Sequence, residues 1–293
     1  MELLRAATLT VVDPEATAAR YVEWLDYSIV ERGPVSLDLA AAWGCPASAG
    51  RASVVCRPAS AAEVFLRFIE GATPADYRPL RTFGWAAIEI CTQDTHAVNA
   101  RMEGSPFQII GPPKELDGLP SIFPMQVKGP DQEIVYLTQI RDNLPAYDLP
   151  RAASLIDKLF IIVLACSDLQ ASLDWFETEL KLSAGRSMDL VYTMINAAFD
   201  LPADTKHALA TMMHGRDCFL ELDQYPDETT ARPTEPGALP PGIAITTFRH
   251  PDFNALRGWI SPPVVRNGAV YGGRRAGTLR APDGALVEVV EAA

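Results

Sequence analysis

One carboxylate interrupts an otherwise apolar stretch of the chain near residue 90. Glu89 lies within Ala86-Ala-Ile-Glu-Ile-Cys91, which is typical of a buried strand. If the side chain faces an apolar interior, loss of hydration raises the pKa of its carboxyl, which can then act as a general acid or base. A one-residue slip of register turns the same side chain to solvent, so both orientations stay open. Tyr136, in the strand-like segment 133–140, adds a phenolic donor that can join this chemistry or simply pack.

Histidine and cysteine, the usual nitrogen and sulfur ligands of a transition metal, are sparse in this chain. The four histidines fall at a helix start, in a hairpin and in a turn; they are His96, His207, His214 and His250. The five cysteines are scattered, and no two have CxxC spacing. We therefore expect buried free thiols, with neither a zinc site nor a disulfide framework.

A repeated pattern predicts the elements that position these residues. A short apolar strand, an Asp able to cap a helix and an apolar-periodic helix recur four times, at a spacing of roughly seventy to eighty residues. The copies contain the aspartates Asp13, Asp94, Asp168 and Asp252. Three further strand-like segments follow each helix. The sequence thus predicts an α+β fold made of four βαβββ modules.

One such module cannot close on itself, because its sheet leaves an apolar face and an edge uncovered. Two modules side by side form a cupped half-barrel with its helices outside, and two such pairs fill the chain. We expect modules one and two to form a first domain, residues 1–145, and modules three and four a second, residues 151–293. Residues 142–150 are expected to connect the domains, and the inserted segment 191–204 can cover a pocket mouth.

Composition narrows the class of protein. The chain has 293 residues, of which 48% are hydrophobic and 21% charged, as in an ordinary globular protein. A net charge of -12 without any block of Lys and Arg argues against a nucleic-acid partner. No apolar run reaches the length of a membrane helix, and residues 1–10 lack the pattern of a secretory signal. We expect a cytoplasmic protein whose partner is a small molecule, with a homodimer left open.

Three stretches resemble the modules of the vicinal oxygen chelate superfamily, which includes glyoxalase I, extradiol dioxygenases and the bleomycin-resistance proteins. They are Leu9-Thr-Val-Val-Asp13 with its helix, Leu164-Ala-Cys-Ser-Asp-Leu169 with its helix, and Ala281-Pro-Asp-Gly-Ala-Leu-Val-Glu288. The last is the most specific, because this family typically ends a module with Pro-Asp-Gly, two or three apolar residues and a Glu. The resemblance covers nearly the whole chain and implies two glyoxalase-like half-barrels, each around a cavity.

Given these cups, the alternation of side chains along a strand predicts which residues face the cavities. The closing strands place Tyr136, Glu221 and Glu288 on the cavity side, and together with Glu89 these are the candidate catalytic residues. The candidate substrate-binding residues are Thr8, Thr10, Cys91, Thr138, Phe219 and Thr246, with His207 beside the inserted segment.

The superfamily's metal ligands are a His or Gln near the start of an opening strand and a Glu on a closing strand. Glu221 and Glu288 match the second kind, whereas the positions of the first kind hold Ala6, Ala87, Ile161, and Gly242 or Ala244. The resemblance therefore predicts no His-ligated metal and no metal cofactor. Two glutamates with water can still hold Mg²⁺ or Mn²⁺, so a divalent cation at Glu221 and Glu288 stays open.

We interpret the chain as an enzyme of the isomerase or lyase type that acts on a small, largely apolar or aromatic molecule by carboxylate acid/base chemistry. Either Glu89 with Tyr136 or Glu221 with Glu288 would transfer the proton, and the sequence does not choose between the cups. One alternative is a metal-free protein that sequesters a small molecule, as in the bleomycin-resistance branch. A weaker alternative is a metal-dependent dioxygenase or glyoxalase-like enzyme with displaced ligands. The superfamily hosts all three.

Overall fold

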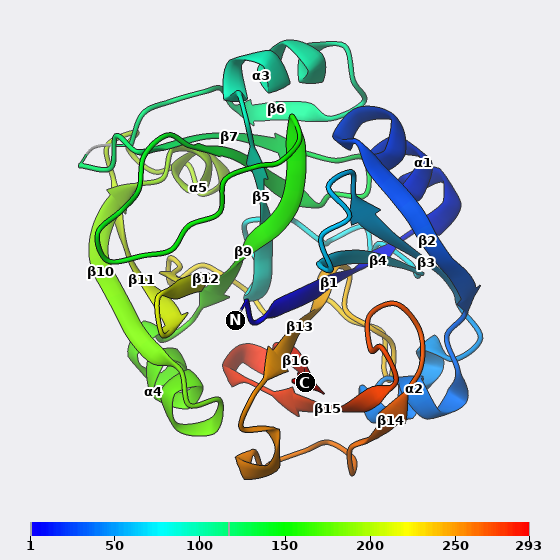
Figure 1. The fold of residues 1–293 in the computed structure, drawn as a ribbon. Coiled ribbons are helices and arrows are strands. Elements are labelled where there is room, and N and C mark those ends of the chain that lie inside the picture. The colour runs from blue at the N-terminus through cyan, green and yellow to red at the C-terminus, as the bar shows by residue number, and fades with distance from the viewer. Residues whose placement is uncertain (1, 117, 293) are drawn as a thin grey trace.

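Four successive modules can be followed along the chain in the computed structural model, which describes residues 2–116 and 118–292 (Figure 1). Module one contains β1 (Leu4–Val11), α1 (Pro14–Leu25), β2 (Tyr27–Pro34), α2 (Leu37–Ala42), β3 (Ala52–Pro58) and β4 (Phe65–Glu70). Module two contains β5 (Gly84–Thr92), α3 (Thr95–Glu103), β6 (Gln108–Gly111), β7 (Ile122–Lys128) and β8 (Ile134–Ile140). Module three contains β9 (Ile156–Cys166), α4 (Leu169–Glu179), β10 (Ser183–Val191), α5 (Thr193–Ala198), β11 (Lys206–His214) and β12 (Asp217–Gln224). Module four contains β13 (Gly242–His250), β14 (Val264–Arg266), β15 (Arg274–Arg280) and β16 (Leu286–Glu291).

Three of the repeated aspartates cap helices as predicted. The Asp13 carboxylate accepts hydrogen bonds from the first free N–H groups of α1, Asp94 does the same for α3, and Asp168 does so for α4. Each cap satisfies donors that have no partner inside the helix, and the negative charge lies at the positive end of the helix dipole. The repeated Asp therefore ends each opening strand and starts each helix.

Module four departs from the pattern, because its helix is replaced by a single 3₁₀ turn, η2 (Phe253–Ala255). Asp252 makes no side-chain hydrogen bond to this turn. Gly258 has a φ of 74°, which a right-handed helix cannot contain, and two prolines follow at 262 and 263. The helix expected over residues 253–259 is therefore wrong.

The two sheets each combine modules that are not neighbours in sequence. One sheet has the order β14-β15-β16-β13-β1-β4-β3-β2 and joins modules one and four; the other has the order β10-β11-β12-β9-β5-β8-β7-β6 and joins modules two and three. The pairing expected from the sequence, one with two in residues 1–145 and three with four in residues 151–293, is wrong. All the opening strands are apolar and similar, so the local repeat does not encode which two of them pair. We call the concave side of the first sheet cup I and that of the second sheet cup II.

The α+β class and the half-barrel architecture are as predicted. The largest apolar core lies on the helix-facing sides of both sheets and includes Leu9 of β1, Tyr21 of α1, Ile88 of β5 and Ile162 of β9. Separate, smaller clusters lie on the concave sides. A direct link joins the sheets, because the Trp85 indole N–H donates to the Leu286 carbonyl at 2.8 Å.

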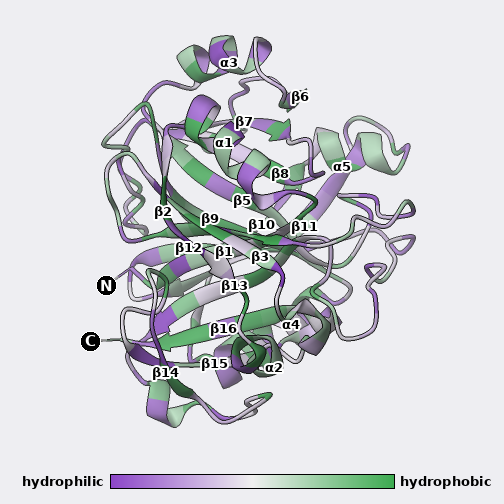
Figure 2. Cartoon of the chain, turned by 90° about the vertical axis from the view of Figure 1, so that its right-hand side faces the viewer, coloured by the Kyte–Doolittle hydropathy of each residue, from purple (hydrophilic) through white to green (hydrophobic). Residues whose placement is uncertain are grey.

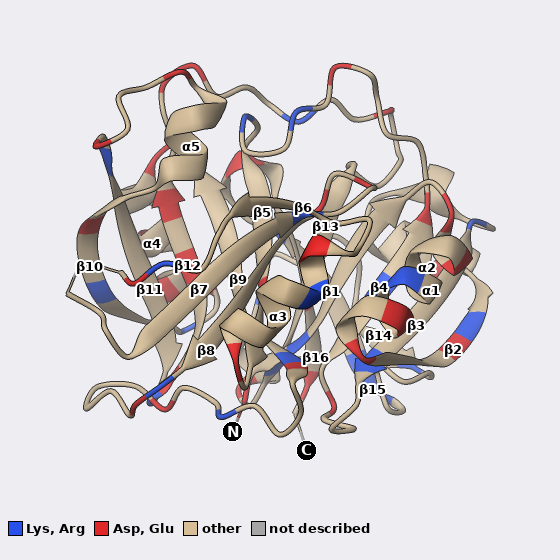
Figure 3. Cartoon of the chain, turned by 90° about the horizontal axis from the view of Figure 1, so that it is seen from above, with Lys and Arg blue, Asp and Glu red and all other residues tan. Residues whose placement is uncertain are grey.

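Hydrophobic residues follow the sheet strands, with β9 and β16 largely apolar in Figure 2. Acidic and basic residues are interspersed over the side seen in Figure 3, without a continuous basic band in that view. Within residues 2–116 and 118–292, no helix combines the length and apolarity needed to cross a bilayer.

The module pairing predicts how fragments of the chain behave. Residues 1–145 or 151–293 expressed alone should not fold, because the pairs β1–β13 and β5–β9 both cross this boundary. Each fragment would expose the central strand of two sheets as an unpaired apolar edge. Co-expression of the two fragments should restore one folded complex with a 1:1 ratio of fragments. Circular dichroism, amide NMR dispersion and size-exclusion chromatography measure both outcomes. A monomeric, well-dispersed 1–145 fragment would contradict the observed pairing.

Candidate functional site

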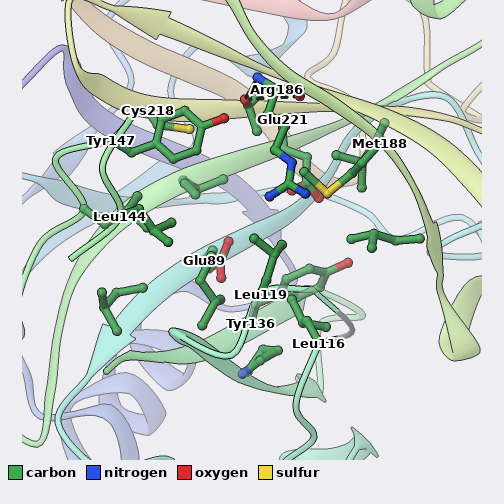
Figure 4. Close-up of a pocket in the computed structure, with 18 of the residues that line it drawn as sticks. Glu89, Leu116, Leu119, Tyr136, Leu144, Tyr147, Arg186, Met188, Cys218 and Glu221 are labelled. Atoms are coloured by element: carbon green, nitrogen blue, oxygen red, sulfur yellow. Dashed lines mark hydrogen bonds between the residues drawn. The ribbon is translucent and has the colours of Figure 1, made fainter. Parts of the chain in front are cut away.

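Cup II encloses an apolar cavity that brings together three of the four predicted catalytic residues (Figure 4). Its volume is about 780 Å³, counting the space at its open mouth. Leucine, isoleucine and aromatic side chains form most of the wall, including Leu119, Leu144, Tyr147 and Phe160. The loops on either side of β7 and β8 contribute several of these residues. The segment 142–150, expected only as a connection, thus forms part of the cavity wall.

Strand register brings three of the predicted catalytic residues into this one cavity. Glu89 on β5 lies beside Tyr136 of the parallel strand β8 and opposite Ile161 of β9. Glu221 on β12 lies beside Val163 of β9 in the same sheet. Glu89, Tyr136 and Glu221 all line the cavity. The question of register is settled for Glu89, because its side chain faces the apolar interior and is only 7% exposed.

The surroundings of Glu89 stabilise the protonated form of its carboxyl. Burial, and then the negative charge of Glu221, raise the pKa of Glu89 to about 8. The Thr138 hydroxyl donates a hydrogen bond to Glu89 Oε1 and opposes this shift. Thr138 was predicted to bind substrate; it is fully buried and instead positions the Glu89 carboxyl.

Glu221 has a second acid, Asp223, close to it on β12. The Tyr192 hydroxyl donates to Glu221 Oε1 at 2.6 Å. Burial raises the pKa of Glu221, while the hydrogen bond from Tyr192 opposes the rise. Asp223 lies two residues further along β12 and is completely buried; burial and the charge on Glu221 raise its pKa well above the ordinary value. A negative charge on one of these carboxyls raises the pKa of the other, so the pair does not lose both protons in the ordinary range of either acid.

Two further residues predicted to bind substrate in this region, Cys91 and Phe219, do not line the cavity. Cys91 is buried in the apolar cluster on the concave side, away from the cavity wall. Phe219 is wrong as a cavity residue, because it packs edge-to-face on Phe248 in the main core, with ring centroids 5.2 Å apart. A register shift between Met212 and Met213 lets Cys218 line the cavity instead.

His207 lies beside the inserted segment, as expected, but does not line the cavity. Its Nε2 is 2.6 Å from Asn196 Oδ1, and Asn196 in turn donates to the carbonyls of Ala203 and Thr205. The histidine therefore fixes the insertion that carries α5. Tyr192, directly before α5, then reaches into the cavity from this segment. The sequence indicated the insertion but gave no sign that its first tyrosine would bind Glu221.

Cup I contains a buried ion pair beside a second cavity, which Trp43, Arg67 and Tyr271 help to line. Glu288 Oε2 lies 3.0 Å from the Arg67 guanidinium, and both side chains are at most 3% exposed. Trp43 and Tyr271 donate to Glu288 Oε1, and Thr247 donates to Oε2. Burial alone would raise the pKa of Glu288, but the Arg67 charge and these hydrogen bonds outweigh it and lower the pKa. Glu288 is thus a satisfied structural carboxylate, and the expectation that it pairs with Glu221 for catalysis or a shared cation is wrong.

Two of the predicted threonines, Thr8 and Thr10, are on β1 and belong to this other cup. The Thr8 hydroxyl accepts from Arg67 Nε at 2.9 Å, and Thr10 packs against Gly71. Thr246 is on the wrong face: it lies opposite Ala7, on the helix side, and Thr247 faces the cup in its place. A bulge between the pairs Thr8–Ile245 and Leu9–Ile243 inverts the alternation along β13.

The donors in cup II do not fit the His-containing metal site of the superfamily. The residues of its opening and closing strands that line the cavity provide no imidazole; they are Glu89, Tyr136, Ile140, Phe160, Ile161, Cys218 and Glu221. In the part of the chain that the structure describes, no group of three or more His, Cys, Asp or Glu side chains is arranged to hold a metal ion.

Comparison with solved structures confirms the fold. Glyoxalase I from Zea mays superimposes with a TM-score of 0.63 at 16% sequence identity, covering 98% of this chain and 92% of that chain. A variant of the same enzyme gives a TM-score of 0.65 at 17% identity, with 98% and 92% coverage. A proposed dioxygenase from Bacillus subtilis gives 0.62 at 13% identity, covering 98% and 84%. No family model and no curated protein matches the sequence. The chain therefore has the vicinal oxygen chelate fold, and at these identities the likeness speaks for the fold alone.

The ion pair in cup I predicts a large effect on stability. Arg67→Met leaves Glu288 buried without its counter-charge and should lower the free energy of unfolding by about 3–5 kcal/mol. The double variant Arg67→Met/Glu288→Gln removes both charges and should recover at least half of this loss. Urea denaturation at pH 7 measures both. A double variant as unstable as the single one would show that the charges do not determine the stability of cup I.

The raised pKa of Glu89 predicts that its charge destabilises the fold at high pH. The unfolded carboxyl ionises near pH 4.3 and the folded one at about 8. Folded Glu89 therefore holds its proton more tightly, and wild-type stability falls as pH rises between these values. Glu89→Gln mimics the protonated form and should melt at least about 4 °C above wild type at pH 9, with little difference at pH 4.

Thermal unfolding across this pH range gives the comparison, with Glu23→Gln on the exposed face of α1 as the matched control. An equal shift in melting temperature at pH 4 and pH 9 would mean that folding does not raise the pKa of Glu89.

Proposed function

We propose that this protein is an enzyme that moves protons on a small, largely apolar or aromatic molecule bound in cup II, in a reaction of the isomerase or lyase type. The observation that supports it is the presence of two carboxyl groups, Glu89 and Glu221, in one apolar cavity. Groups of this kind hold different protonation states when their surroundings move their pKa values apart. A general acid and a general base facing one substrate are what both reaction types need.

The roles follow from the neighbours of each carboxyl. Glu221 accepts from Tyr192 and lies beside the protonated Asp223, so Glu221 is the group that carries negative charge and acts as base. Glu89, with its pKa near 8, is protonated at neutral pH and acts as acid. In a turnover, Glu221 removes a proton from carbon, and Glu89 donates one to the atom where negative charge develops. The substrate loses one proton to Glu221 and gains one from Glu89, so no other reactant is needed.

The cavity wall supports an apolar substrate. Leu116, Leu119, Leu149 and Phe160 surround the two carboxyls and limit water around them. Removal of water strengthens the interaction of each carboxyl with a charge that develops on the substrate. The same wall would also bind an apolar compound without any reaction. That second function, sequestration, is favoured by the hydrogen bonds that already satisfy one oxygen of each carboxyl.

Turnover should depend on both carboxyls. Glu89→Gln and Glu221→Gln should each lower kcat by about 10²–10⁴-fold, which is the usual contribution of a general acid or base. In wild type, kcat/KM should fall as pH rises through about 8, because Glu89 then loses the proton it donates. The assay is incubation with a compound collection in D₂O, followed by mass spectrometry for deuterium incorporation and for new products.

Glu23→Gln is the control for these variants and should keep full activity. Compounds that bind wild type and Glu89→Gln equally, with no deuterium uptake and no product in either, would replace the enzyme by a sequestering protein.

A further inference from the structure

Arg186 introduces a positive charge into the otherwise apolar and acidic lining of cup II. Among the described residues that line the cavity it is the one Lys or Arg. Figure 4 shows its side chain lying with the other lining residues, near those of Met188 and Glu221 in that view. Across residues 2–116 and 118–292, no carboxylate lies within 4.0 Å of its guanidinium. Its side chain is exposed at the cavity, so its five N–H donors are open to a ligand or to solvent and are not taken up by a carboxylate of the described residues.

A bulge in β10 aims Arg186 at the cavity. The pairing of β10 with β11 shifts by one residue between Ala184 and Ser187, so that Gly185 and Arg186 together lie opposite Thr211. The Thr211 hydroxyl accepts from the Arg186 backbone N–H at 3.0 Å. A Cβ at Gly185 would lie 2.4 Å from this same hydroxyl, so the bulge requires glycine there. Bulges often redirect a side chain next to a functional site, and this one is held in place by a specific hydrogen bond.

The charges in the cavity are separated in a way that orients a ligand. Glu221 repels an anionic group, whereas Arg186 attracts one with hydrogen bonds of the charge-assisted kind. Met188, Leu190 and Leu209 lie on the same two strands as Arg186 and Thr211 and provide an apolar surface beside the guanidinium. An apolar molecule with one anionic end fits this combination, because its charged end can contact Arg186 while its apolar part packs on these side chains.

We propose that the molecule bound in cup II is an organic anion, an apolar or aromatic body with a carboxylate or similar group that Arg186 binds. This rests on the function proposed above, because it assigns the substrate class of the same cavity. Arg186 sets specificity: it holds the charged end so that the apolar body lies over Glu89 and Glu221. A neutral compound of the same shape lacks this contact and binds more weakly.

A matched pair of fluorescent probes tests the proposal. 8-Anilinonaphthalene-1-sulfonate and N-phenyl-1-naphthylamine share one ring system, and only the first carries a negative charge. Fluorescence titration of wild type should show the sulfonate binding at least about tenfold more tightly than the neutral amine. Arg186→Met keeps the length of the side chain and removes its charge. It should lower the sulfonate affinity by about tenfold or more and leave the affinity of the amine within about twofold, since one charge-assisted contact is lost.

Arg257→Met is the control, because it removes the same charge from an exposed site in module four. It should change neither affinity. Equal affinities of the two probes in wild type, a sulfonate affinity unchanged by Arg186→Met, an equal loss in both methionine variants, or failure of both probes to bind would each overturn the anion site. No turnover enters this test, so the acid/base proposal would still be judged by the Glu89→Gln assay alone.

Discussion

The antiparallel pairing of β5 with β9 determines what cup II contains. These two opening strands belong to modules two and three, and their hydrogen bonds place Glu89 opposite Ile161, while β12 adds Glu221 from the other side of β9. Had the modules paired in sequence order, Glu89 and Glu221 would lie in different cups. The acid cluster is therefore a product of long-range strand pairing and not of any local motif. In cup I the long-range pairing of β1 with β13 likewise brings Arg67 to Glu288.

The two cups solve one physical problem in two ways. Each has a glutamate in a largely apolar interior, Glu288 in cup I and Glu89 in cup II, where an isolated charge is unfavourable. Cup I supplies a cation and three hydrogen-bond donors, so Glu288 stays ionised and inert. Among the described residues cup II supplies no buried cation, so the pKa values of its carboxyls rise instead, that of Glu89 to about 8. Only the second solution leaves groups that exchange protons near neutral pH, which is why the candidate site lies in cup II.

Much of the fold could be predicted, because it is encoded locally and repeated. The Asp caps, the apolar strands and the Pro-Asp-Gly ending each follow from neighbouring residues. Side-chain parity held along β5 and β8, whose pairing with each other has no register shift, and placed Glu89 and Tyr136 correctly. It failed for Thr246 and Phe219, because bulges shift the alternation and depend on partner strands that a sequence does not show. Arg186 escaped prediction for the same reason, since it faces the cavity only through the bulge opposite Thr211.

Asp223 shows why the acid cluster is costly and still informative. Both of its carboxyl oxygens are buried without a hydrogen-bond partner among the described residues. An apolar residue at this position would remove an unsatisfied polar group and stabilise the sheet. The fold instead places an acid with a strongly raised pKa two residues from Glu221 on β12, where it holds its proton and adds no second negative charge. This placement brings no gain in stability, whereas the proton transfer that we propose for cup II would use it.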